Sequence, residues 1–421
     1  MAGYLVYTSP ARGHLFPLVP TLRELENRGH EVRLRTLSPE VEPMRALGLT
    51  AESISAAVEQ RELDDWKAAN PVTALRRAGQ TFVDRAAEEI VDLHQAIRRH
   101  RPDALFVDIN SWGAMAAAEA SGLPWAAFAP YFLPFQAAGI PPWGLGLAPR
   151  HDLVGRFRDA VLWWLVQRLF DGPLAQLNGL RRQLGLGSLS HALHWVSLPP
   201  RLLYYTAEPF EYPRSWPAHV RLVGPGIWEP PPEASDVPHD ERPVVLVTCS
   251  TEFQNDGSII QMALDGLSRE PVRVVATTAA VDPRTFQAPA NTTVERFLPH
   301  GPLLERAACV VCHGGMGITQ KALSAGVPLC VVPFGRDQLE VARHVEMAGA
   351  GVRLSPRGMT PEKLREAVRG AMSKRAGAEA MAEAFRRVGG PGWAADLLEE
   401  LLVKRKRLQT DERSRQLTAK S

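Results

Sequence analysis

The stretch CVVCHGGMGITQKALSAGVPLCVVPFGRDQLEVARHV, residues 309–345, decides the fold of this chain. It opens with a short apolar run that predicts a buried strand, and the glycine-rich turn His313–Gly317 then leads into a helix that Gly326 is expected to end. A second apolar run, Pro328–Val332, predicts another buried strand, and the polar turn Phe334–Gln338 precedes another helix. Strands that alternate with helices in this way indicate a parallel sheet covered by helices.

The turn between the first strand and its helix has the composition of an anion-binding site. Backbone N–H groups converge at a helix N-terminus, and the helix dipole favours negative charge there. Gly315 leaves room for a phosphate to approach the backbone and permits a positive φ, and His313 can donate a hydrogen bond to a phosphate oxygen. Asp337 and Gln338 follow the next strand, at the edge where doubly wound sheets bind ligands. A glycine-rich turn alone, however, is more often a simple connection between a strand and a helix.

Three blocks of this stretch together resemble the donor-binding signature of the family-one, GT-B-type glycosyltransferases. The family signature runs His-Gly-Gly-x-Gly-Thr, then Ala-Leu-x-x-Gly-Val-Pro, then Pro-x-x-x-Asp-Gln. The corresponding blocks here are His313–Ile318, Ala322–Pro328 and Pro333–Gln338. Two positions depart from the signature: Ile318 stands where the family usually has a hydroxyl, and Lys321 stands where plant members carry a glutamate that holds the nucleotide ribose.

Length and composition are those of an ordinary globular protein. The 421 residues suffice for two or three domains, and 45% hydrophobic with 22% charged residues is typical of such proteins. A formal net charge of +2 gives no general reason to expect nucleic acid as a partner. Cys309 and Cys312 mimic a metal-binding Cys-x-x-Cys motif, but residues three apart on a strand face opposite sides of the sheet, so we expect buried thiols.

No stretch of the sequence predicts a membrane span or a secretory signal. Tyr4–Tyr7 is too short for a signal, and the most apolar internal run, Ala160–Val166, is far below the roughly 20 residues needed to cross a bilayer. The basic run Lys404–Arg407 is interpreted as part of a solvated tail. We therefore expect a soluble, cytoplasmic protein that is a monomer or a homodimer.

The first half of the chain repeats a strand–helix–strand pattern. The expected elements are a strand at Tyr4–Thr8, a helix at Phe16–Arg28 ended by Gly29, a strand at His30–Thr36, a strand at Ala104–Val107, a helix at Trp112–Ser121 and a strand at Trp125–Phe128. His14 follows the first of these strands and Asp108 ends a later one, so both can meet at the same rim of the sheet. A lone histidine in a loop is usually only solvated. Asp108 could instead cap the helix that begins at Trp112, although Asn110 and Ser111 could also cap it.

The family resemblance implies a role for both residues. Gly13 and His14, with Pro17, resemble the amino-terminal Gly-His-x-x-Pro motif, whose histidine is the catalytic base, and Phe106–Asp108 resembles the strand end that carries its partner aspartate. The loosely patterned region from Ala129 to about Leu198 corresponds to the family's variable acceptor pocket. The acceptor-binding candidates there are Phe132, Phe135, Trp143 and Trp163. Aromatic residues in a helix are as often core packing, but if they line a pocket the acceptor is large and apolar.

The second half opens a new strand–helix series after a proline-rich linker. Strands are expected at Val244–Cys249, Val272–Ala276 and Thr292–Glu295, and Phe297–His300 resembles the family segment that stacks against the nucleotide base. Phe297 stands where plant members have a tryptophan, and it could equally be a core residue. Helices are expected over Pro361–Val388 and near Ala394–Val403. The donor-binding residues implied by the resemblance are Gly13, Ser250, Thr251, Phe297, His300, His313, Gly315, Met316, Gly317, Ile318, Asp337 and Gln338.

These observations predict an α/β protein with two doubly wound, Rossmann-like domains that face each other across a cleft. The expected units are an acceptor-binding domain (1–223), a linker (224–242), a nucleotide-sugar-binding domain (243–390), a helix that returns to the first domain (391–403) and a basic tail (404–421). The resemblance implies inverting transfer from a UDP- or dTDP-sugar to a hydroxyl of a hydrophobic small molecule such as a polyketide, macrolide or flavonoid. The alternatives are another GT-B enzyme, such as a sugar-nucleotide epimerase, and a non-catalytic nucleotide-sugar-binding protein.

No cofactor is expected beyond the nucleotide sugar, which is a co-substrate. The chain contains no Asp-x-Asp motif, which many glycosyltransferases of the other common fold use to hold a metal ion, and we expect chemistry that is independent of metal. The adjacent pair Asp64 and Asp65 is expected to lie far from both motif regions.

Overall fold

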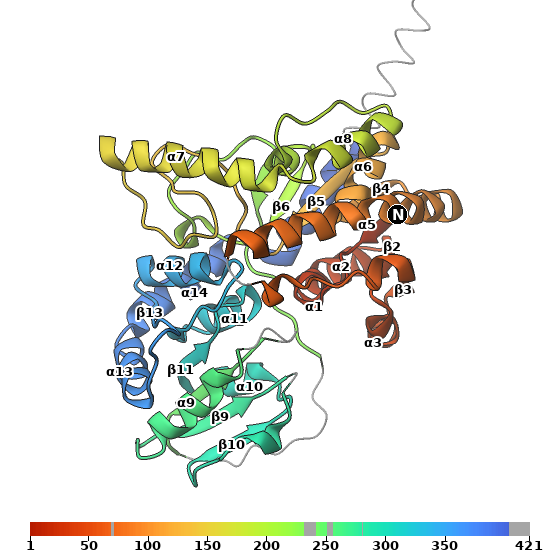
Figure 1. Cartoon of the computed structure of the whole chain (residues 1–421). Helices are drawn as coiled ribbons and strands as arrows, with labels where there is room; N and C mark the ends of the chain where they lie inside the picture. Colours follow the sequence, from red (N-terminus) through yellow and green to blue (C-terminus); the bar gives the residue numbers. More distant parts are fainter. Residues whose placement is uncertain (69–70, 231–240, 251–255, 280, 404–421) are drawn as a thin grey trace, which may run out of the picture.

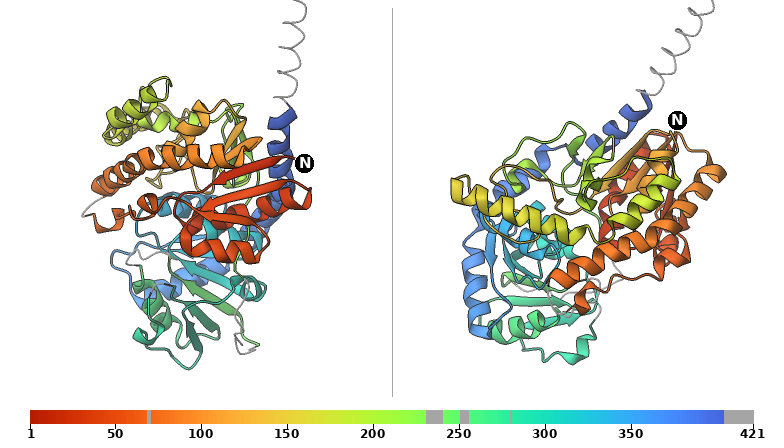
Figure 2. Two further views of the ribbon diagram at one scale, coloured as in Figure 1. Left: turned by 90° about the vertical axis from the view of Figure 1, so that its right-hand side faces the viewer. Right: turned by 45° about the horizontal axis from the view of Figure 1, so that its top comes forward.

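Two parallel β-sheets, one in each half of the chain, organise the structure (Figure 1). The computed structural model describes residues 1–68, 71–230, 241–250, 256–279 and 281–403. The strand order of the first sheet is β3-β2-β1-β4-β5-β6-β7, and that of the second sheet is β10-β9-β8-β11-β12-β13. All neighbouring strands run parallel, and helices cover the sheets, which confirms the predicted doubly wound α/β class (Figure 2).

The central strands of the first sheet are short apolar runs that are buried almost completely. Its strands are β1 (Gly3–Tyr7), β2 (Glu31–Thr36), β3 (Thr50–Ser53), β4 (Ala104–Asp108), β5 (Trp125–Ala129), β6 (Leu202–Tyr204) and β7 (Val220–Leu222). Its helices are α1 (Arg12–Leu15), α2 (Val19–Asn27), α3 (Val41–Ala46), α4 (Ala56–Glu59), α5 (Pro71–His100), α6 (Trp112–Ala120), α7 (Leu153–Phe170) and α8 (Leu174–Gln183). Because helices pack on both faces, its central strands are continuous hydrophobic runs rather than alternating ones.

The second sheet follows the same plan. Its strands are β8 (Val244–Thr248), β9 (Arg273–Thr277), β10 (Thr292–Glu295), β11 (Ala307–Cys312), β12 (Leu329–Val331) and β13 (Gly351–Arg353). Its helices are α9 (Ser258–Leu267), α10 (His300–Leu304), α11 (Met316–Ser324), α12 (Gln338–Met347), α13 (Pro361–Met372) and α14 (Arg375–Arg387). The four cysteines are free thiols and buried.

Several predicted boundaries differ from the structure. The helix expected over Phe16–Arg28 is broken into a 3-10 turn at Phe16–Leu18 and α2, because Pro17 and Pro20 cannot donate a backbone hydrogen bond. Gly29 follows α2 with φ +81°, as a helix stop requires. The helix predicted over Pro361–Val388 is two helices, α13 and α14. Strands β3, β6, β7 and β13 and the long helix α5 were not predicted.

In each sheet the strand order reverses at one central strand, because later strands are added on both of its sides. In the first sheet β1 lies between β2 and β4, and in the second sheet β8 lies between β9 and β11. The crevice beyond the carboxyl ends of such a central pair is where doubly wound sheets bind ligands. The chain places His14 and Asp108 after β1 and at the end of β4, and places Ser250 and His313 after β8 and β11.

A final helix, residues 390–403, leaves the second sheet and packs against the first (Figure 2, left). Its apolar residues Ala394 and Leu398 belong to the same buried cluster as Leu22 of α2. Arg28 at the end of α2 contacts Asp396 and Glu399, 2.6 Å and 3.0 Å from its Nη1 atom. The helix therefore fastens the end of the described chain to the first sheet.

A second link between the halves corrects a prediction. Asp65 is buried and its carboxylate forms a bidentate ion pair with Arg336, with distances of 2.8 Å and 2.9 Å. Arg336 directly precedes Asp337 and has a φ of +52°. The expectation that Asp64 and Asp65 lie far from both motif regions is therefore wrong, because Asp65 holds the turn before α12. The sequence separation of 271 residues gave no sign of this contact.

Candidate active site

His14 and Asp108 meet at the rim of the first sheet. The Nδ1 atom of His14 lies 3.0 Å from Oδ1 and 2.9 Å from Oδ2 of Asp108. Asp108 is fully buried, and its carboxylate also accepts hydrogen bonds from the backbone N–H and hydroxyl of Ser9 and from the backbone N–H of Asn110. The cap of α6 is Ser111, so Asp108 does not cap that helix. A carboxylate held by Ser9 and Asn110 fixes the imidazole through Nδ1, with Nε2 on the opposite side of the ring.

Two residues that were not predicted complete the surroundings of His14. The side-chain amide of Asn110 lies 3.4 Å from Nε2 of His14 and accepts a hydrogen bond from the hydroxyl of Tyr131 at 2.5 Å. The ring of Tyr131 is 5.4 Å from the ring of His14. Asn110 stands two residues beyond the strand end, and this position was the only sequence signal that could have drawn attention to it.

The ionisation of Asp108 suits a permanent partner of a histidine. Burial alone would raise the pKa of this carboxyl, but His14 and the N–H groups of Asn110 and Ser9 lower the pKa below its ordinary value. Behind it lies Glu89 of α5, which is fully buried and accepts a hydrogen bond from the N–H of Gly113 at 2.8 Å. Burial raises the pKa of Glu89 to about 8. Glu89 thus holds the first turn of α6, just beyond Asp108.

Glu89→Gln is expected to flatten the dependence of the free energy of unfolding on pH. A folded-state pKa raised above the unfolded value contributes stability that is complete below about pH 4.5 and is lost as the pH rises through about 8. Over that window the parent should lose about 4 kcal/mol more than the variant. Denaturant unfolding at several pH values checks this, with Glu88→Gln, on the partly exposed face of α5, as the control. Parallel pH profiles for parent and Glu89→Gln would contradict it.

The glycine-rich turn lies at the rim of the second sheet and forms the N-terminus of α11. Gly314 has a φ of +93°, which only glycine adopts easily. Gly315 is the N-cap of α11 with φ −66°, so the positive φ that a glycine permits occurs at Gly314 and not at Gly315. Met316 and Ile318 lie in the first turn and pack inward, and a Cβ at Gly317 would meet no other atom. The first backbone N–H groups of α11 are thus open to a ligand.

His313 lies against this turn and is only 7% exposed. Its Nδ1 atom is 3.7 Å from Asp256, whose carboxylate accepts hydrogen bonds from the backbone N–H and hydroxyl of Ser250. Burial lowers the pKa of His313 below its ordinary value. Asp256 was not predicted. Thr251, which was, lies outside the described residues.

Two further predicted donor residues, Phe297 and His300, follow strand β10. Phe297 is 52% exposed, and His300 contacts the hydroxyl of Thr277 at 3.1 Å. Burial lowers the pKa of His300 to about 4. Lys321 is paired with Glu229 at 3.1 Å, and the same carboxylate accepts the N–H of His300.

Asp337 and Gln338 begin α12, opposite the rim of the first sheet. Burial raises the pKa of Asp337, and the nearby charges of Arg336 and His14 act against that rise. Asp337 therefore lies within electrostatic reach of His14. The Oε1 atom of Gln338 accepts the N–H groups of Phe334 and Gly335, so this amide oxygen stabilises its own turn.

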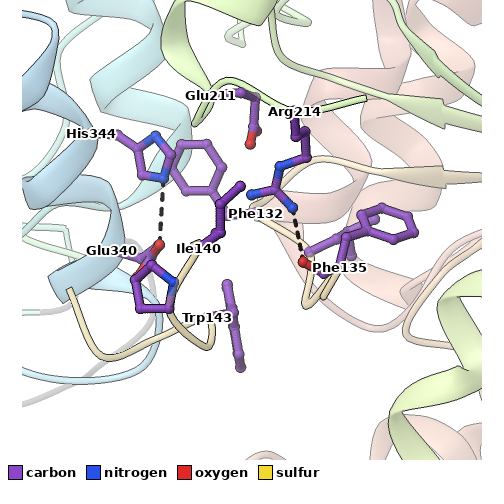
Figure 3. A pocket seen from close by; sticks show the side chains of 10 residues that line it. Phe132, Phe135, Ile140, Trp143, Glu211, Arg214, Glu340 and His344 are labelled. Atoms are coloured by element: carbon purple, nitrogen blue, oxygen red, sulfur yellow. Dashed lines mark hydrogen bonds and ion pairs between the residues drawn. The ribbon is translucent and has the colours of Figure 1, made fainter. Parts of the chain in front are cut away.

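Three of the four predicted acceptor residues line one small cavity (Figure 3). Phe132, Phe135 and Trp143 contribute aromatic walls. Helix α12 of the second half contributes Glu340 and His344, and the ring of His344 stacks on Phe132 with centroids 4.0 Å apart. The cavity offers only about 10 Å³ to water, roughly the space of one molecule. Its walls therefore come from both halves of the chain and are partly charged.

Trp163 does not reach this cavity. Its indole N–H donates to the carbonyl of Ile140 at 3.2 Å, and it packs in a separate cluster with Val166, Phe170 and Leu193. Core packing, one of the two alternatives for the aromatic helix, thus describes Trp163. The neighbouring Trp164 is 57% exposed.

Comparisons with known proteins agree with this architecture. Residues 261–398 match the family model described as "Erythromycin biosynthesis protein CIII-like, C-terminal domain". The crystal structure of the calicheamicin glycosyltransferase aligns with a TM-score of 0.76 at 20% identity, over 96% of this chain and 98% of that chain. A Streptomyces sp. SF2575 glycosyltransferase complexed with thymidine diphosphate aligns with a TM-score of 0.70 at 18% identity, over 95% and 100%.

Sequence relatives extend over most of the chain. The 4'-demethylrebeccamycin synthase of Lentzea aerocolonigenes is 33% identical over 397 residues, which are 89% of this chain and 92% of that protein. A "PGL/p-HBAD biosynthesis glycosyltransferase" of Mycobacterium tuberculosis is 32% identical over 307 residues, 70% of this chain and 68% of that protein.

Two doubly wound parallel sheets in one chain are the arrangement of the GT-B class of glycosyltransferase folds. The solved structures share this fold along nearly the whole chain. The extent of the sequence match identifies the family within this fold class. The chain belongs to the family-one natural-product glycosyltransferases, whose members act in antibiotic and other natural-product biosynthesis. In the described part of the chain, no helix is both long and apolar enough to span a membrane.

Proposed function

We propose that the protein transfers a sugar, with inversion, from a UDP- or dTDP-sugar to a hydroxyl of a hydrophobic small molecule. The observation that carries the proposal is the His14–Asp108 pair, at 2.9 Å, at the rim of the first sheet and within electrostatic reach of Asp337. A nucleotide sugar held by that turn presents its anomeric carbon toward the first sheet. Relatives and structural neighbours support the class of reaction, and one neighbour was solved with thymidine diphosphate.

In the proposed reaction the acceptor hydroxyl attacks the anomeric carbon while Nε2 of His14 takes its proton. The bond between that carbon and the diphosphate oxygen breaks, and the nucleoside diphosphate leaves with the bonding electrons. Asp108 holds the tautomer with the proton on Nδ1 and stabilises the imidazolium that forms. The N–H groups at the start of α11, together with His313, stabilise the charge on the leaving diphosphate.

The first half is proposed to hold the acceptor and the second half the donor. Phe132, Phe135 and Trp143 are proposed to contact the acceptor, which requires their cavity to widen beyond its space for about one water molecule. Phe297 is proposed to stack on the base because its ring is half exposed. Release of nucleoside diphosphate from UDP- and dTDP-sugars, with and without phenolic and polyketide acceptors, tests the activity. Acceptor-dependent release with a glycosylated product supports it. Acceptor-independent turnover would favour an epimerase, and binding without turnover would favour a non-catalytic protein.

Transfer is expected to proceed in excess chelator at nearly the rate measured without it. In the proposed mechanism the N-terminus of α11 and a hydrogen bond from His313 stabilise the negative charge of the diphosphate, so no hard cation is required. The nearby carboxylate of Asp256 is already engaged by Ser250. Initial rates after dialysis against EDTA check this. A steep loss that Mg²⁺ or Mn²⁺ restores would contradict it.

A further inference from the structure

Helix α7 is apolar on two opposite sides. One side, which includes Trp163, Val166 and Phe170, is buried against the protein. The other side faces water. Six of the fourteen large apolar side chains that are exposed in the described part of the chain lie on this helix: Leu153, Val154, Phe157, Val161, Trp164 and Leu165. We call these six residues the outer face of α7.

The exposure of the outer face is large for apolar side chains. Leu153 is 82% exposed, Phe157 74% and Trp164 57%. The residues Leu153, Phe157, Val161 and Leu165 recur every four positions, so they form one stripe along the helix. Isolated exposed apolar residues are normal on a protein surface, but a continuous stripe of this size marks an interaction site.

Exposed arginines lie beside the outer face. Arg156 and Arg168 are exposed, whereas Arg158 is partly exposed and paired with Asp159 at 2.8 Å. The exposed carboxylate of Asp152, just before the helix, is paired with Arg150. The guanidinium of Arg168 lies over the ring of Trp164, 5.7 Å from its centroid. The acidic residue within α7, Asp159, is only 3% exposed. Apolar residues including tryptophan and phenylalanine, flanked by arginine, are typical of helices that lie in the interface of an anionic membrane.

We propose that the outer face of α7 binds the surface of a bilayer that contains anionic lipids. The apolar stripe would enter the headgroup boundary, and the arginines would contact lipid phosphates. Figure 1 shows α7 at the outer edge of the first half. A second copy of the chain fits this face less well, because a two-fold interface would bring two sets of arginines together.

The same helix connects the outer face with the proposed acceptor site. On its buried side, Phe170 lies 6.5 Å from Trp143, ring centroid to ring centroid, and Trp143 lines the cavity. A protein held at a bilayer in this way would meet apolar acceptors that are concentrated in the lipid. The binding itself does not depend on the proposed activity and is measured without substrates.

Co-sedimentation of the full chain with vesicles tests the proposal. Binding is expected to vesicles of phosphatidylcholine mixed with phosphatidylglycerol, and to be weaker at high salt and on phosphatidylcholine alone. Phe157→Ser combined with Trp164→Ser should weaken partitioning about tenfold or more, and Arg156→Gln combined with Arg168→Gln about tenfold on the mixed vesicles. The matched control, Val91→Ser with Met347→Ser, removes apolar residues of similar exposure elsewhere and should bind like the parent.

Because Lys404–Arg407 can bind anionic vesicles by charge alone, a full-length chain with these four residues changed to glutamine is measured as well. This glutamine variant should bind the mixed vesicles still more weakly when Phe157→Ser and Trp164→Ser are added. The proposal is overturned if the parent does not bind the mixed vesicles, or if the outer-face variants bind like the parent. It is also overturned if those variants convert a dimer to a monomer in analytical ultracentrifugation, which would assign the face to a second copy.

Discussion

His14→Ala is expected to lower the turnover number by about 10²–10⁴ and to leave donor binding and the fold unchanged, which is the usual contribution of a positioned general base. The imidazole is 16% exposed and held by Asp108, so its removal takes away the proton acceptor without opening the core. The turnover number at saturating donor and acceptor measures the chemistry, and calorimetry with UDP and TDP measures donor binding. The exposed His194→Ala is the matched control.

The partner residue provides a second arm of this experiment. Asp108→Asn should also lower turnover, because an amide can present its NH₂ group to Nδ1 and so favour the wrong tautomer of His14. The charge that stabilises the imidazolium is lost as well. Unchanged turnover of His14→Ala with saturating acceptor would remove His14 from the mechanism. An Asp108→Asn variant as active as the parent would reduce Asp108 to a structural role.

The central strands could be predicted because each is recognisable from its own sequence, without knowledge of the strands beside it. Runs such as Ala104–Val107 and Val244–Cys249 are apolar apart from Thr248, and polar, turn-forming residues follow each of them. Strands β6, β7 and β13 have three residues each, and a run so short has no recognisable period. Helix α5, in contrast, has a clear amphipathic pattern over Pro71–His100 and could have been predicted.

Site residues that belong to a sequence motif could be predicted. Site residues that are brought together only by tertiary packing could not. His14 and His313 stand in strings whose order and spacing match a known signature. Asp65 and Asp256 lie in no motif, and only the packing of distant segments brings them to Arg336 and His313. The sequence of α7 likewise contains Trp163 and Trp164 side by side, and rotation by one helical position buries one and exposes the other.

The second large effect is expected at the donor turn, where the structure supplies a reason that the sequence did not. A Cβ added to Gly315 would lie 2.4 Å from Nε2 and 3.0 Å from Cε1 of His313. The His313 ring is buried, so it cannot move aside freely. Any side chain at Gly315 must therefore displace His313 or shift the first turn of α11, and both changes disturb the groups proposed to hold the diphosphate.

Gly315→Val is accordingly expected to weaken binding of UDP or TDP by at least about 100-fold, since loss of two charge-assisted hydrogen bonds costs about 3–6 kcal/mol. Binding of an isolated acceptor should change little, because the proposed acceptor walls lie on the other rim. Gly179→Val, in α8, is the matched control, since a Cβ there meets no other atom. Calorimetric titration of each variant with nucleotide and with acceptor separates the two sites. If a folded Gly315→Val protein loses nucleotide and acceptor binding equally, the donor and acceptor sites have been divided wrongly. If it binds nucleotide like the parent, the N-terminus of α11 is not the diphosphate site.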